Sequence, residues 1–183
     1  DSDTGESIAL RSGEIVPCQI TGCSKGTAGS PGELKGRFLS AHAIGTIRIN
    51  GENGVYGSTR AQFAGQKMEV AFAQEVEAGD AEIWTTTSGE TPRAYRVKIE
   101  KISDADPRRN MVLRVVDREL LAQTGGIVQG MSGSPIVQNG RLVGAVTHVL
   151  VNDPTRGYGI FAQTMLEQAE IVAQRAQEPE LAK

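Results

Sequence analysis

One stretch decides the fold: Gly125-Gly126-Ile127-Val128-Gln129-Gly130-Met131-Ser132-Gly133-Ser134-Pro135. Gly130 and Gly133 flank Ser132 and permit the positive φ values and close backbone approach of a tight turn. A serine that attacks a carbonyl carbon needs such a turn, with backbone N–H groups free to bind the developing oxyanion. Gly and Ser are also ordinary turn residues. The stretch therefore predicts either a nucleophile turn or a plain glycine-rich hairpin.

The residues that follow predict a β-hairpin. Asn139-Gly140 is a strong signal for a two-residue turn, and apolar segments flank it at 136–137 and 142–146. The return strand is expected to run back past Ser132 and to carry His148.

The whole region resembles one family. The runs 124–135, 144–149 and 151–155 are similar to those of the sporulation stage IV protein B peptidases, the signalling serine peptidases of endospore-forming bacteria. The resemblance extends over residues 1 to about 172. It implies a chymotrypsin-like double β-barrel and serine endopeptidase activity on a protein or peptide substrate; we expect no cofactor.

The resemblance also implies a setting for this activity. Members of the family are anchored proteins that face the space between mother cell and forespore, with a PDZ domain upstream. The implied substrate is a regulatory membrane-protein complex, whose cleavage triggers intramembrane proteolysis of a sigma-factor precursor. Any membrane attachment of this chain would then lie in an upstream segment.

The expected catalytic groups centre on Ser132. It has glycines at positions −2 and +1, which Ser134 lacks, so Ser132 is the expected nucleophile. The N–H groups of Gly130 and Ser132 are expected to form the oxyanion hole. Asp117 matches the family's proposed acid, although a strand-end carboxylate or helix N-cap is the alternative for this residue.

The general base is the open question, because the chain has two histidines, His42 and His148. Chain order in chymotrypsin-like peptidases favours His42. The family resemblance places the histidine in a Gly-His motif before a stretch like Asp1-Ser2-Asp3-Thr4-Gly5-Glu6. We follow the resemblance and expect the base upstream of Asp1, His42 in a loop, and the chain as printed to be inactive.

His148 is a candidate for the substrate pocket. It is expected on the strand that lines the pocket, on the same face as Val146 and Leu150, where its N–H groups would meet a substrate side chain. The alternative is a buried, hydrogen-bonded histidine.

Composition excludes several other functions. Net charge is −3, from 19 basic and 22 acidic residues, and no basic run marks a nucleic-acid interface. No apolar run approaches the roughly 18 residues of a membrane span. Two separated histidines without a carboxylate cluster predict no metal site.

The remaining patterns predict an all-β chain that ends in a helix. Short apolar segments alternate with turn signals, and the boundary between the two barrels is expected near residues 60–80, the first barrel being incomplete at its N-terminus. Thr164 and Glu167 suggest a capping box that begins a helix at 164–178. Cys18 and Cys23 are expected to be free thiols unless a turn at Thr21-Gly22 joins them. The glycine-rich segment 25–33 is expected to be a surface loop.

Two alternatives to a working peptidase stay open. The chain is either a non-catalytic module that binds peptides in the same cleft, or a catalytically incomplete fragment without its general base.

Overall fold

The structure is a computed structural model that describes residues 12–62, 65, 67–103 and 105–177. The family-like stretch Asp1–Glu6 lies outside the described residues. In chain order the elements are β1 (Gly13–Ile15), β2 (Cys18–Ser24), β3 (Glu33–Phe38), β4 (Gly45–Gly51), β5 (Gly54–Thr59), the short 3-10 helix η1 (Ala73–Glu75), β6 (Gly79–Thr85), β7 (Arg93–Ile102), β8 (Met111–Val115), α1 (Arg118–Thr124), β9 (Pro135–Gln138), β10 (Arg141–Leu150), β11 (Asp153–Phe161) and α2 (Ala162–Gln177).

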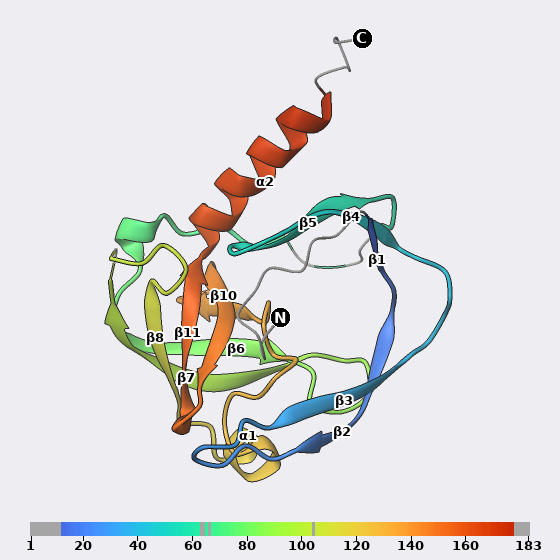
Figure 1. The fold of residues 1–183 in the computed structure, drawn as a ribbon. Coiled ribbons are helices and arrows are strands. Elements are labelled where there is room, and N and C mark those ends of the chain that lie inside the picture. Colours follow the sequence, from blue (N-terminus) through green and yellow to red (C-terminus); the bar gives the residue numbers. More distant parts are fainter. Residues whose placement is uncertain (1–11, 63–64, 66, 104, 178–183) are drawn as a thin grey trace.

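Strands β6 to β11 close into one barrel, in the order β10-β11-β8-β7-β6-β9 (Figure 1). Neighbouring strands in this barrel are antiparallel. The β9–β10 hairpin turns at Asn139 (φ 52°) and Gly140 (φ 76°), and two positive φ values are what a two-residue type I′ turn requires. The expected mostly β architecture, with a hairpin after Ser132, is confirmed.

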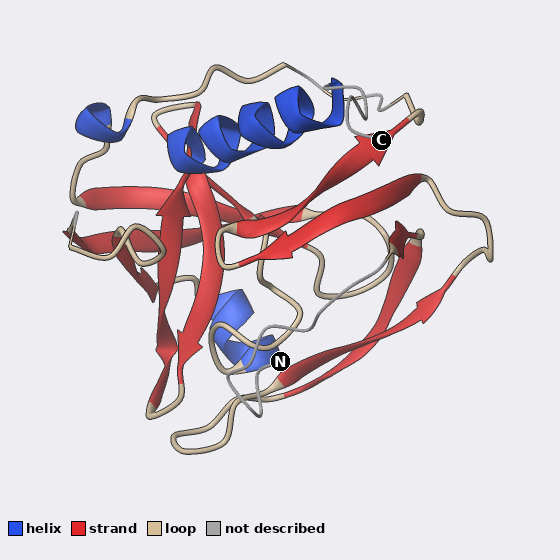
Figure 2. Cartoon of the chain, turned by 45° about the horizontal axis from the view of Figure 1, so that its top comes forward, coloured by secondary structure: helices blue, strands red, loops and turns tan. Residues whose placement is uncertain are grey.

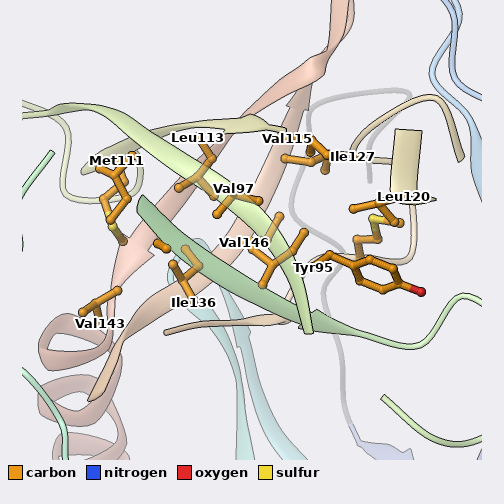
Figure 3. Close-up of a cluster of buried hydrophobic side chains, with 14 of the residues drawn as sticks. Tyr95, Val97, Met111, Leu113, Val115, Leu120, Ile127, Ile136, Val143 and Val146 are labelled. Atoms are coloured by element: carbon orange, nitrogen blue, oxygen red, sulfur yellow. The ribbon is translucent and has the colours of Figure 1, made fainter. Parts of the chain in front are cut away.

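The barrel interior explains why these segments form strands. Alternate residues point inward, as in β8, where Met111, Leu113 and Val115 are buried while the residues between them are partly exposed. Figure 3 shows these side chains meeting Val97 of β7, Ile136 of β9 and others across the barrel. Burial of one such side chain stabilises the fold by about 1.5–3 kcal/mol.

The described chain before the barrel forms two small sheets instead of a second closed barrel. One sheet has the order β1-β4-β5 and the other is the β2–β3 ribbon. Within residues 12–62, Tyr56 is the buried large apolar side chain, whereas Phe38 and Val55 are 76% and 51% exposed. With so little apolar burial, this part has less to hold it together than the barrel has.

The two cysteines lie on β2, and both thiols are free, as expected. Cys18 is opposite Phe38 and Cys23 is opposite Leu34, so the two residues sit near opposite ends of the ribbon. Thr21 lies at a register shift in β2 and not at a reversing turn. The strand therefore keeps the two sulfur atoms apart.

Helix α2 follows β11 without a break. It begins at Ala162, so the expected capping box at Thr164 is wrong, because Thr164 already lies inside the helix. Gln163 instead accepts a hydrogen bond from the N–H of Ala73 (3.0 Å) through its side-chain oxygen. Figures 1 and 2 show the helix against β10, β11 and β5, which it contacts. Val172 is buried and Leu166 and Ile171 are exposed.

Candidate active site

The turn that carries Ser132 is anchored by buried apolar residues that come just before this serine. Ile127, Val128 and Met131 are at most 2% exposed, and Ser132 next to them is exposed. The Met131 N–H donates to the carbonyl of Val128 (3.1 Å), and the Ser134 N–H donates to that of Met131 (3.0 Å). A buried methionine thus fixes a turn that presents its neighbouring hydroxyl to solvent.

Glycines supply the backbone conformations of this turn. Gly130 has φ 95° and Gly133 has φ 88°, both in the left-handed region that other residues rarely adopt. A Cβ on Gly130 would also lie 3.1 Å from the Cβ of Leu34. The two glycines that predict a nucleophile turn are therefore required by its geometry.

The hydroxyl of Ser132 donates a hydrogen bond to the carbonyl oxygen of Thr147 on β10, at 2.6 Å. Two backbone hydrogen bonds hold the turn against the same strand: Gly133 N–H to the Val146 carbonyl (2.8 Å) and Val146 N–H to the Ser134 carbonyl (2.9 Å). The expected approach of the return strand to Ser132 is thus observed. Sequence reasoning missed Thr147, and no sequence signal marks it, because its main chain makes the contact.

Two N–H groups of the turn remain available to a ligand. Among the described residues, none accepts a hydrogen bond from the N–H of Gly130 or of Ser132. The residues on either side of Ser132, Met131 and Gly133, already donate their N–H groups to backbone carbonyls. Gly130 and Ser132 are the pair expected to form an oxyanion hole, and this arrangement leaves both free for that role.

The glycine-rich segment 25–33 supports the turn and is more than a surface loop. The Gly26 N–H donates to the Thr124 carbonyl (2.8 Å), and the Gln129 N–H donates to the Gly32 carbonyl (2.8 Å). Leu34, at the start of β3, donates its N–H to the Gln129 carbonyl (2.9 Å). Backbone therefore packs on backbone along the residues just before Gly130.

These contacts explain further glycines of the decisive stretch. A Cβ on Gly125 would lie 2.3 Å from the Gly26 carbonyl oxygen, and one on Gly126 would lie 2.0 Å from the Pro154 carbonyl oxygen. Both glycines also have positive φ, of 78° and 141°. No larger residue fits at either position without a shift of the neighbouring backbone.

Asp117 is the N-cap of α1. Its side chain accepts hydrogen bonds from the N–H groups of Glu119 (2.9 Å) and Leu120 (3.1 Å) through one oxygen, and from that of Arg96 (3.3 Å) through the other. Burial by itself would raise the pKa of Asp117, but the backbone donors outweigh it and lower the pKa. The structure thus shows the capping role that the sequence left open, and the catalytic role stays a prediction.

His42 lies in the connection between β3 and β4, as a loop residue. Its ring Nδ1 is 3.2 Å from the hydroxyl of Ser40, which also accepts the His42 N–H at 2.9 Å. The hydrogen bond of Ser132 goes to Thr147. The described contacts therefore do not join His42 to the expected nucleophile.

His148 lies on the outer side of β10, opposite Tyr158 of β11. A register shift between Val146 and His148 turns Val146 into the core, 1% exposed, and leaves His148 exposed. The expectation that both share a face is wrong because of this bulge. Partial burial of the ring, followed by the charges of Arg109 and Arg108, lowers the pKa of His148. Its role in substrate binding stays a prediction.

No helix in the described part of the chain is long and apolar enough to cross a membrane.

The match to a family of known proteins agrees with the resemblance noted in the sequence. No match is found among curated protein sequences. Among solved structures, the chain is similar to a crystal structure of Rv3671c from M. tuberculosis H37Rv, a serine-to-alanine mutant in an inactive form. The TM-score is 0.48 at 17% sequence identity, over 92% of this chain and 82% of that chain. Residues 1–166 match the family described as SpoIVB peptidase S55. The chain therefore belongs to the SpoIVB peptidase S55 family and is a serine peptidase domain.

Proposed function

We propose that the chain is the catalytic domain of a serine endopeptidase in which Ser132 attacks the scissile carbonyl of a protein substrate. The observation that carries this proposal is the exposed Ser132 hydroxyl on a glycine turn whose Gly130 and Ser132 N–H groups are unbonded among the described residues. Attack places negative charge on the carbonyl oxygen, and two such donors are the usual means of stabilising it.

The hydroxyl must lose its present partner before it can react. A peptide carbonyl accepts a hydrogen bond but does not take up a proton at neutral pH, so Thr147 does not act as a base. Ser132 Oγ forms the bond to the carbonyl carbon while its proton passes to a general base, and that base then protonates the leaving amine. The reaction thus requires Ser132 to turn from Thr147 toward an imidazole.

We assign the base to the histidine that the family resemblance places before Asp1, and the orienting acid to Asp117. The three backbone N–H donors on the Asp117 side chain support the second assignment, because they hold the carboxylate in one position. On this proposal the chain as printed lacks the base and reacts slowly, although its nucleophile turn is formed.

The bond between Ser132 and Thr147 also favours one alternative, a peptide-binding domain that does not cleave. In that case the same turn would bind a carbonyl group without attack. Reactivity of the hydroxyl separates the two functions, because only an activated serine reacts rapidly with a phosphonate.

The test is labelling with a fluorophosphonate, followed by mass spectrometry to find the modified residue. We expect rapid labelling of Ser132 in a chain extended upstream through the Gly-His motif, and slow labelling of the chain as printed. His42→Ala in the extended chain should leave the rate nearly unchanged. Equal, rapid labelling of both chains that is lost with His42→Ala would show that His42 is the base. No labelling of the extended chain would favour the peptide-binding alternative.

For the physiological substrate we propose a regulatory membrane-protein complex outside the cytoplasm, whose cleavage triggers intramembrane proteolysis of a sigma-factor precursor. Membership in the SpoIVB peptidase S55 family supports this proposal. Incubation of the extended chain with such a complex, purified from an endospore-forming bacterium, tests it: a discrete cut lost with Ser132→Ala is expected, and an intact complex contradicts it.

A further inference from the structure

We propose that a pocket beside the nucleophile turn binds an apolar side chain of the substrate residue that follows the scissile bond. The inference rests on the proposed peptidase function and adds a specificity site to it. The pocket has a volume of about 260 Å³, and its lining includes Ile20, Leu34, Trp84, Glu90, Pro92 and Gly133.

The pocket lies on one flank of Ser132, and Thr147 lies on the other. Strand β9, which follows the turn, is paired with β10 on one side and with β6 on the other. Ser132 donates its hydrogen bond to Thr147 of β10, whereas the pocket is formed by the end of β6 at Trp84 and the connection after it. A peptide whose carbonyl sits over Ser132 therefore extends along β10 in one direction and over the pocket in the other.

The direction in which the bound substrate runs follows from the groups that lie on each side of Ser132. We place the acyl part of the substrate along β10, because the nucleophile turn is hydrogen-bonded to this strand through Ser132, Gly133 and Ser134. The leaving amine and the residues after it then lie on the β6 flank. Gly130, which donates toward the oxyanion, also lines the pocket, so the pocket begins beside the reacting carbonyl.

Besides the nucleophile turn, three segments build the pocket, namely β2, β3 and the end of β6 with the connection after it, and hydrogen bonds fix each of them. Ile20 and Gly89 exchange N–H···O bonds of 2.8 and 2.9 Å, which join β2 to the connection after β6. Leu34 is held by its N–H bond to Gln129. The indole N–H of Trp84 donates to Glu82 at 3.3 Å. The pocket is thus largely formed before any ligand binds, as in most binding sites.

The chemistry of the lining selects the side chain. Ile20, Leu34, Trp84 and Pro92 present apolar surface, and Glu90 is the charged residue among the described residues that line the pocket. Whole small-molecule sites span about 300–1,000 Å³, so a smaller space suits a single side chain. A leucine side chain would bury apolar area here, and a glutamate would meet the charge of Glu90.

Trp84 makes the proposal measurable without any cleavage. It is the single tryptophan of the chain and is 40% exposed, so its emission reports directly on the pocket. The probes are Leu-Gly-amide and Glu-Gly-amide, which resemble the leaving part of a cleaved substrate, and acetyl-Gly-Leu, which resembles the acyl part. They are titrated into the Ser132→Ala chain.

We expect Leu-Gly-amide to shift the Trp84 emission to the blue in a saturable way. It should bind roughly tenfold more tightly than Glu-Gly-amide and acetyl-Gly-Leu, the size of effect that one apolar side chain gives in a hydrophobic pocket. Ile20→Ala should weaken the binding of Leu-Gly-amide about tenfold. Val55→Ala, a matched truncation at a residue outside the pocket, should leave this binding unchanged. Glu90→Gln should reduce the difference in affinity between Leu-Gly-amide and Glu-Gly-amide.

Three outcomes would overturn the proposal: no saturable shift with any probe, equal binding of the two amides to the chain that retains Glu90, or tighter binding of acetyl-Gly-Leu than of Leu-Gly-amide. Because these titrations need no base, they can fail while fluorophosphonate still labels Ser132. Failure of labelling with intact peptide binding would instead refute the peptidase function alone.

Discussion

The Ser132 hydroxyl is bonded to the main-chain carbonyl of Thr147, 2.6 Å away on the neighbouring strand. This contact holds the expected nucleophile to the barrel wall through a group that every residue possesses. It positions the serine without activating it, because a carbonyl does not accept its proton. Activation therefore depends on a base that competes with Thr147 for the hydroxyl.

The first prediction concerns the choice between the two serines of the turn. Ser132→Ala should abolish peptide cleavage by the extended chain, because loss of a triad serine typically costs about 10⁶ in turnover. Ser134→Ala should leave substantial cleavage, since the Ser134 backbone makes the described contacts of this residue. Turnover of a fluorogenic peptide measures both. An inactive Ser134→Ala beside an active Ser132→Ala would show that Ser134 is the nucleophile.

Asp117 offers a way to separate a helix cap from a catalytic acid. Asparagine caps helices about as well as aspartate, but its amide nitrogen cannot accept the Arg96 N–H that the second oxygen of Asp117 accepts. Asp117→Asn should therefore lower the free energy of unfolding by less than Asp117→Ala, which also removes the cap and should cost about 1 kcal/mol or more. If Asp117 also orients the base, Asp117→Asn should still reduce kcat by about 10⁴.

Urea unfolding and peptide turnover of the two Asp117 variants provide the measurement. A fully active Asp117→Asn with a destabilised Asp117→Ala would leave Asp117 with its capping role alone.

Replacing a glycine of this stretch by alanine should lower the free energy of unfolding by an amount that depends on the position. Gly133→Ala adds only left-handed strain, about 1–2 kcal/mol, because nothing lies within 4 Å of its added Cβ. Gly126→Ala also places alanine at a positive φ, of 141°, and adds a Cβ 2.0 Å from the Pro154 carbonyl oxygen. Because strain and overpacking add, Gly126→Ala should lower the free energy of unfolding by about 3 kcal/mol or more. Denaturant midpoints compare the two, and equal losses would contradict the packing described.

The pKa of His148 predicts a pH dependence of stability. Partial burial and the charges of Arg109 and Arg108 lower this pKa in the folded state, while the unfolded chain titrates near 6.5. In the window below about pH 6.5 the unfolded state binds more protons, so the free energy of unfolding should decrease as the pH falls. His148→Gln should flatten this part of the stability curve.

An NMR titration of the His148 ring protons measures the pKa directly. Arg109→Gln should move it upward, whereas Lys98→Gln, which removes a positive charge that does not act on His148, should not. A pKa at or above about 6.5 in the unmodified chain would refute the prediction.

Local patterns were sufficient for the nucleophile turn and the hairpin that follows it. Gly130, Gly133, Asn139 and Gly140 adopt the positive φ values that their sequence positions predict. Such conformations depend on the residue itself and on its immediate neighbours, so a sequence states them directly. The same holds for the alternating apolar strands of the barrel.

Other features depended on partners that are distant in the chain. The support of Gln129 by Gly32 and Leu34, and the contact between Ser132 and Thr147, run through main-chain groups that carry no residue signature. The bulge that separates Val146 from His148 reversed the expected direction of a side chain. The sequence by itself determined that a serine turn flanked by glycines precedes a β-hairpin in a mostly β chain. Only the tertiary structure decided what holds that turn and what lies beside it, because backbone hydrogen bonds and strand register are set when the barrel closes.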